Sequence, residues 1–168
     1  MATILINPLS YKVEPFFVRS QYELNVKFEK AGEPEYEAEF ISGTDRERQH
    51  FAATGNKPVQ FFDREYTMRA LDEHKKAIVT YLAAEQGYPF KRALISCECF
   101  RVYESMEQVF DYFISSFDIT ERHPLYMYIN EEEWIRDQLL NSQYLELKAD
   151  KETFAIVHPN FLKGGKKE

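Results

Sequence analysis

The chain has 168 residues, of which 44% are hydrophobic, 15% aromatic and 29% charged. This composition is typical of a folded protein with one hydrophobic core and excludes an intrinsically disordered chain. The formal net charge of -7 argues against direct binding of nucleic acid, because phosphate contacts require clustered Lys and Arg side chains. A basic protein partner is favoured instead.

Residues 22–40 are predicted to form a β-hairpin. Apolar and polar residues alternate over residues 22–28 and again over residues 36–40, as in strands with one buried face. A segment that contains Gly32 lies between these two runs and is typical of a turn. With the turn centred on Gly32, one face of the hairpin would be apolar and the other charged.

The charged face of this predicted hairpin is acidic. Alternate residues of a strand lie about 6.8 Å apart, which is close to the spacing of successive phosphates in a nucleic-acid strand. Like charges on one face repel each other, so we interpret the face as a docking surface for a basic groove. The alternative is a solvated face whose charges deter aggregation. The candidate partner-binding residues of this face are Glu23, Glu29, Glu35, Glu37 and Glu39.

Two helices are predicted after the hairpin. Thr44 and Glu47 have the spacing of a capping box, and Gly55 follows as a stop signal for a short helix. Apolar residues then recur at helical spacing over residues 64–86, and Gly87 ends this second helix.

The middle of the chain is predicted to form a βαβ unit. Residues 92–103 are rich in β-branched, aromatic and thiol side chains, which favours a strand. Residues 105–117 begin with a capping box at Ser105 and carry a strong apolar stripe, which predicts a core helix. Residues 125–129 form an apolar run typical of a buried strand, so a right-handed crossover is expected.

A second acidic cluster follows Asn130. This residue is predicted to cap a helix whose first turn is acidic, an arrangement that the helix dipole stabilises. Trp134 is the only tryptophan of the chain, and we interpret Glu131, Glu132 and Trp134 as further candidate partner-binding residues. The alternative is that Trp134 is a half-buried core residue.

The chain ends with a predicted hairpin over residues 144–148 and 153–157, followed by a flexible basic tail over residues 163–168. No linker or repeat divides the sequence. We therefore predict one α+β domain over residues 1–162, with a mostly antiparallel sheet that contains both hairpins and the βαβ unit, packed with three or four helices.

The sequence shows no pattern for catalysis, metal binding or a cofactor. The four histidines have no metal-binding spacing, and only six glycines are present, which disfavours a phosphate-cradling loop. No catalytic residue, no metal ligand and no cofactor is therefore predicted. The enzymatic alternative would place Glu98 in a pocket with His74 or His123, where it would act as a general acid or base.

Cys97 and Cys99 are predicted to be two reduced thiols that share the buried face of a strand. Their spacing suits neither a disulfide nor a zinc site, which favours a cytoplasmic protein. The N-terminal sequence has no basic region before its short apolar run, and no run of 18 apolar residues occurs. No secretion and no membrane span are therefore expected.

The sequence leaves three functional hypotheses. The first is a small acidic protein that binds a basic, nucleic-acid-handling protein and blocks or regulates it by charge mimicry, in the general manner of inhibitors of restriction or CRISPR systems. The second is a structural subunit of a homo-oligomer. The third is a small enzyme that acts on a nucleotide-like or small metabolite.

Overall fold

A computed structural model describes residues 1–10, 12–32, 35–119, 122–141 and 144–157. The chain divides into two compact units, Met1–Leu94 and Ile95–Glu168. Helices accompany two antiparallel sheets, so the predicted α+β class is confirmed. A single domain over residues 1–162 stays a prediction, and the tail over residues 163–168 lies outside the described residues.

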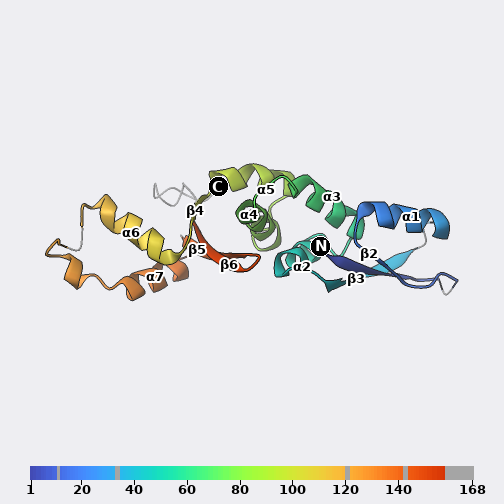
Figure 1. The fold of residues 1–168 in the computed structure, drawn as a ribbon, viewed down its shortest axis with the longest axis horizontal. Helices are drawn as coiled ribbons and strands as arrows, with labels where there is room; N and C mark the ends of the chain where they lie inside the picture. The colour runs from blue at the N-terminus through green and yellow to red at the C-terminus, as the bar shows by residue number, and fades with distance from the viewer. Residues whose placement is uncertain (11, 33–34, 120–121, 142–143, 158–168) are drawn as a thin grey trace. The chain divides into compact units, whose positions relative to one another are not determined.

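The first unit combines a small sheet with helices. Its strands have the order β2-β1-β3, and both outer strands are antiparallel to β1. Helix α1 lies along the sheet (Figure 1). The elements are β1 (Thr3–Pro8), β2 (Phe16–Val18), α1 (Gln21–Ala31), β3 (Tyr36–Ser42), α2 (Asp45–Ala53), α3 (Pro58–Met68), α4 (Glu73–Ala84) and α5 (Phe90–Ser96), the last of which crosses the boundary between the units.

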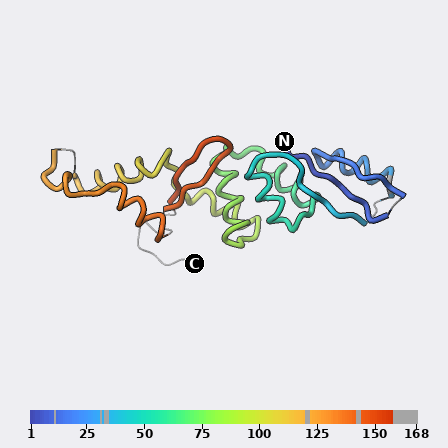
Figure 2. The backbone as a smooth tube through the Cα atoms, turned by 90° about the horizontal axis from the view of Figure 1, so that it is seen from below, coloured from blue at the N-terminus to red at the C-terminus, as the bar shows by residue number. Residues whose placement is uncertain are grey.

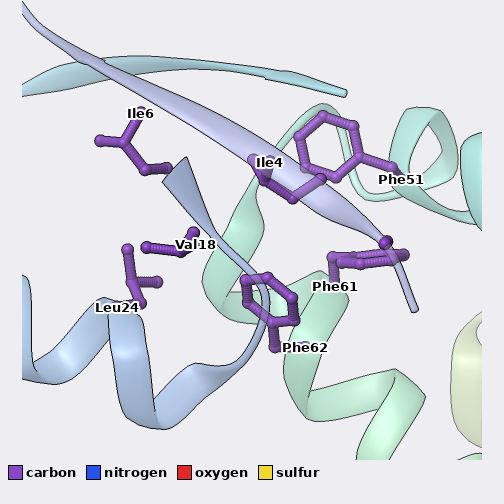
Figure 3. Packing of buried hydrophobic residues seen from close by; sticks show 8 residues of the cluster. Ile4, Ile6, Val18, Leu24, Phe51, Phe61 and Phe62 are labelled. Atoms are coloured by element: carbon purple, nitrogen blue, oxygen red, sulfur yellow. The ribbon is translucent and has the colours of Figure 1, made fainter. Parts of the chain in front are cut away.

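The core of the first unit lies between one face of the sheet and helices α1, α2 and α3. Side chains from all of these elements point toward one another (Figure 3). A ring contact joins α2 to α3. The centroids of Phe51 on α2 and Phe61 on α3 lie 5.4 Å apart in an edge-to-face arrangement, which is favourable for aromatic pairs. The labelled core residues are Ile4, Ile6, Val18, Leu24, Phe51, Phe61 and Phe62.

The predicted hairpin over residues 22–40 is wrong in its first half, because that half is helix α1. The hydroxyl of Ser20 accepts a hydrogen bond from the backbone N–H of Glu23 and caps the helix. Gly32 ends it in the left-handed conformation, with φ of 73°. Leu24 and Phe28 are four residues apart and therefore face the core from the same side of the helix. The second half is strand β3, as predicted, but its partner is β1.

Helix α2 confirms the predicted capping box. Thr44 accepts from the N–H of Glu47, and the Glu47 carboxylate accepts from the N–H of Thr44. Gly43 makes the turn from β3 into this helix with φ of 153°. A Cβ atom at position 43 would lie 2.6 Å from the ring of Phe40 and 3.2 Å from the Cα of Ala2, so the turn leaves no room for a side chain.

The helix predicted over residues 64–86 is in fact parts of two helices, α3 and α4. Pro58 occupies the first turn of α3, where its missing N–H has no cost. Asp72 caps α4 by accepting from the N–H of Lys75 at 2.8 Å. The apolar stripe of the sequence runs across this break, which is why the two helices were predicted as one.

The second unit contains a sheet of order β4-β6-β5, in which both pairs are antiparallel. Figure 2 shows the hairpin of β5 and β6 in red. The elements are η1 (Cys97–Cys99), β4 (Arg101–Tyr103), α6 (Met106–Ser116), η2 (Tyr126–Tyr128), α7 (Glu131–Leu140), β5 (Tyr144–Ala149) and β6 (Glu152–Val157).

The predicted βαβ unit is wrong. Most of the strand expected over residues 92–103 is helical, and only Arg101–Tyr103 forms a strand. The strand expected over residues 125–129 is the short 3-10 helix η2. Strand β4 pairs antiparallel with β6 instead of parallel with a neighbour across α6.

The helix predicted over residues 105–117 and the C-terminal hairpin are confirmed as α6 and as β5 with β6. Asp150 turns the hairpin with φ of 52°. Met106, Val109 and Ala155 are buried together where α6 meets the sheet. The apolar stripe of α6 thus packs as its spacing predicts.

Candidate binding surfaces

Strand β3 displays the predicted carboxylate series. Glu35 directly precedes the strand, Glu37 and Glu39 lie within it, and all three are exposed. The alternate residues of β3 are half-buried and pack against the core. Glu37 is paired with Asn7 and Glu39 with Leu5 on strand β1. No basic residue of β1 therefore stands opposite these carboxylates.

Strand β3 is also an edge of its sheet. In an antiparallel pair, every second residue turns its N–H and C=O groups away from the partner strand. Within the described part of the chain, residues 36–42 make no backbone hydrogen bond other than those with β1. The outer edge of β3 is therefore open to pairing with a further strand.

A groove lies beside this open edge. Its volume is about 460 Å³. Tyr36, Glu37 and Ala38 line it on one side and the turn of residues 55–58 on the other. Because residues from both faces of β3 contribute, we place the groove along the backbone edge of the strand. The groove contains one basic side chain, that of Lys57.

The other two glutamates of the predicted hairpin face do not join this series. Glu23 and Glu29 lie on α1, and α1 packs its residues Leu24 and Phe28 into the core between the helix and the sheet. Glu37 and Glu39 occupy the opposite face of the sheet. Glu23 is also engaged locally, because its carboxylate accepts from the backbone N–H of Arg19 at 2.8 Å. The structure therefore brings together only the glutamates of β3.

The second predicted cluster belongs to helix α7. Glu131 and Glu132 are exposed in its first turn, where the helix dipole favours them. Trp134 is half-buried, with ring centroid distances of 4.7 Å to Phe113 and 5.5 Å to Phe110. Trp134 therefore packs against the core of the second unit.

The residues of the enzymatic alternative come from three different elements. Glu98 is exposed on η1 rather than buried in a strand. His74 lies on α4, half-buried. His123 lies in the loop before η2, where its Nδ1 accepts from the backbone N–H of Leu125 at 3.1 Å. Neither cavity described here is lined by any of these three side chains.

The first unit contains a part-buried polar network that was not predicted from the sequence. Glu65 on α3 makes a two-pronged ion pair with Arg46 on α2, with distances of 2.8 and 3.1 Å. The same carboxylate lies 2.9 Å from Nδ1 of His50, which is fully buried. Arg46 and His50 are one helical turn apart, so their spacing was a signal that both face α3.

This network holds Glu65 in its ionised form. Burial on its own raises the pKa of Glu65, but the hydrogen bonds from His50 and Arg46 outweigh it and, with their charges, lower the pKa to about 2. A carboxylate only accepts hydrogen bonds, so Nδ1 of His50 carries the proton. Phe90 stacks on the imidazole with centroids 6.0 Å apart, which fixes the ring further.

A larger cavity lies against the same carboxylate. It has a volume of about 550 Å³, within the range of small-molecule sites. Its buried walls are apolar, and its acidic residues come from α2 and α3. The lining residues are Met1, Ala2, Arg19, Ser20, Gln21, Tyr22, Glu47, Phe61, Phe62, Asp63, Glu65 and Tyr66.

In the described ranges, no group of three or more His, Cys, Asp and Glu side chains is arranged to hold a metal ion. None of the helices described is both long and apolar enough to cross a membrane. Comparison with protein-family models, with curated proteins and with solved structures gives no match. The function is therefore inferred from the surfaces of the chain itself.

Proposed function

We propose that this chain is a binding protein that docks a basic, extended segment of a protein partner along the open edge of strand β3. One observation carries the proposal: an unpaired strand edge coincides with three exposed carboxylates that no basic residue of β1 opposes. By occupying a basic segment that otherwise contacts phosphates, the chain would block or regulate a nucleic-acid-handling protein.

Two kinds of interaction support this binding mode. A strand added beside β3 would hydrogen-bond to its outward N–H and C=O groups, which gives affinity without regard to sequence. Alternate side chains of the added strand would stand about 5 Å from Glu37 and Glu39. Lys or Arg at every second position would therefore be selected.

The magnitude of the charge contribution follows from cross-strand pairs. Opposite charges in such pairs contribute about 0.2 to 1 kcal/mol each. Three pairs would together change the dissociation constant by about 3- to 150-fold. The contribution falls as salt rises, because these carboxylates are exposed.

A peptide with Lys at alternate positions tests the proposal. The parent chain should bind it. The variant with Glu35→Gln, Glu37→Gln and Glu39→Gln should bind it about 3- to 150-fold more weakly. A control variant with Glu14→Gln, Glu29→Gln and Glu85→Gln has the same net charge and changes only exposed carboxylates outside β3. It should bind like the parent at moderate salt.

The same peptide with N-methyl groups on successive backbone nitrogens separates pairing from charge alone, because both of its edges then lack N–H donors. It keeps all its lysines but cannot complete a strand ladder, so its binding should fall strongly. Equal binding of the methylated peptide, or equal weakening in the two triple variants, would show that β3 is not a docking edge.

A further inference from the structure

An arginine and two tyrosines share one face of the sheet in the second unit, whereas β3 belongs to the first. Arg101 and Tyr103 lie two residues apart on β4 and therefore on the same face of that strand. Tyr144 on β5 lies in the same row of the sheet as Arg101, because both are paired with Val157 on β6. Tyr103 and Tyr144 pack against the buried cluster of α6 and β6, so this is the face that α6 covers.

Helix α6 adds a third tyrosine to this group. The ring centroids of Tyr112 and Tyr103 lie 6.1 Å apart. The guanidinium of Arg101 donates hydrogen bonds to the hydroxyls of Tyr112 and Tyr103, which raises the pKa of Arg101. Burial, and also the nearness of Tyr103 and Tyr112, raises the pKa of Tyr144. The guanidinium and the three hydroxyls therefore lie close together and form a tyrosine–arginine cluster.

The cluster presents hydrogen-bond donors. A phenol oxygen that accepts from Arg101 keeps its own O–H group as a donor. The guanidinium has more N–H groups than two hydroxyls can occupy, and it has no acceptor atom. A ligand that carries several oxygen acceptors would satisfy these groups together.

The positive charge of the cluster is not neutralised by a neighbour. Among the described residues, Arg101 takes part in no ion pair. No carboxylate of these residues contributes to the pKa shift of Arg101 or Tyr144. The pKa of Tyr81, by contrast, is raised by burial and also by Glu85. An anion that approaches the cluster therefore meets a free guanidinium.

The cluster is also accessible and held in position. Arg101 is exposed and Tyr112 is 48% exposed, so a ligand from solvent can reach both. Tyr103 and Tyr144 are half-buried, which fixes their rings against the sheet. Donors on strands and helix thus converge from different sides, and little ordering is needed when a ligand binds.

We infer that the tyrosine–arginine cluster binds a phosphate group, either the free ion or that of a small organic phosphate. The planar fork of an arginine matches two oxygens of a phosphate. A phosphate monoester has more terminal oxygens than a carboxylate, and they surround one atom instead of lying in a plane. The hydroxyls of the cluster can therefore reach the oxygens that the arginine leaves free.

Three probes test this inference on the full chain. Phenyl phosphate carries the group on a ring, inorganic phosphate is the group alone, and benzoate replaces phosphate with carboxylate. Trp134 reports binding through its fluorescence, since its ring centroid lies 5.7 Å from that of Tyr144, and NMR shifts locate it. Phenyl phosphate should saturate the chain, and benzoate should bind at least about tenfold more weakly. Inorganic phosphate that binds as tightly as phenyl phosphate would identify the free ion as the ligand.

A pair of variants then assigns the binding to the cluster. Arg101→Gln with Tyr112→Phe removes the charge and one hydroxyl but keeps the ring contact with Tyr103. This variant should bind phenyl phosphate at least about tenfold more weakly than the parent. The control, Arg122→Gln with Tyr128→Phe, makes the same two changes at exposed positions of the second unit and should bind like the parent.

Three results would overturn the inference. They are no saturation by phenyl phosphate or inorganic phosphate, binding of benzoate as tight as that of phenyl phosphate, and equal binding by the cluster variant and its control. If the cluster variant has lost its native NMR spectrum, Tyr112→Phe alone takes its place. A smaller loss of affinity in the same direction is expected for it, and parental affinity would again overturn the inference.

Discussion

Nδ1 of His50 lies 2.9 Å from Oε1 of Glu65, on the side of the carboxylate that Arg46 also binds. One half-buried carboxylate thus joins the two helices α2 and α3, which also meet through the ring contact of Phe51 and Phe61. Removing Glu65 would leave the half-buried guanidinium of Arg46 without this partner, which lowers stability.

The first prediction concerns acid stability. The pKa of Glu65 is lowered to about 2 from its ordinary value of 4.5. The stability from this group is therefore complete above about pH 5 and is lost as the pH falls toward 2. It amounts to at most about 3 kcal/mol. Urea unfolding at several pH values measures the free energy of unfolding. As the pH falls, this free energy should decrease less for Glu65→Gln than for the parent, whereas Glu85→Gln should follow the parent.

The second prediction tests helix α1, where a hairpin had been expected. Because Ser20 caps the helix, Ser20→Ala should lower the free energy of unfolding by about 1 kcal/mol, and Ser20→Asp should restore most of it. Thermal or chemical unfolding measures both. If Ser20→Ala had no effect, the helix would not depend on this cap.

The third prediction ranks two aromatic residues of α6. Phe110 is 3% exposed, whereas Phe113 is half-buried and contacts Trp134 and Phe117 through ring pairs. Phe110→Ala should cost about 3 to 5 kcal/mol, and Phe113→Ala clearly less. Both variants should change Trp134 fluorescence, because both rings lie next to the indole. An equal cost for the two would show that Phe113 is as deeply packed as Phe110.

The fourth prediction separates the two cysteines. Cys97 is buried at 1% exposure and Cys99 is exposed, so the expectation that both are buried is wrong for Cys99. A thiol reagent should label one cysteine quickly in the native protein and the second only on unfolding. Cys99→Ser should abolish the fast phase, while Cys97→Ser should leave it in place.

The sequence predicted those elements whose local signals and long-range packing agree. Helix α6 has a capping serine and a continuous apolar stripe, and the hairpin of β5 and β6 has a clear turn at Asp150; both were found. Helix α1 was missed although Ser20, Glu23 and Gly32 are start and stop signals of a helix. Its alternating residues fit a strand equally well, and the true partner of β3 is β1, which lies about 30 residues earlier in the chain.

The candidate sites were predicted to different extents. The carboxylates of β3 were found because alternation within a strand is a local pattern. The open edge of that strand depends on the order of the sheet, which periodicity does not specify. The network of Arg46, His50 and Glu65 was missed because Glu65 becomes a partner only when α3 packs on α2.

Gly43 has a consequence for how this fold can diverge. Its missing side chain lets the ring of Phe40, the backbone at Ala2 and the carboxylate of Glu47 converge on one point. Any larger residue would push β1, β3 and α2 apart together. Among natural variants of this chain, we therefore expect a glycine to persist at position 43, three residues after Phe40 and directly before Thr44, even where the surface glutamates have been replaced.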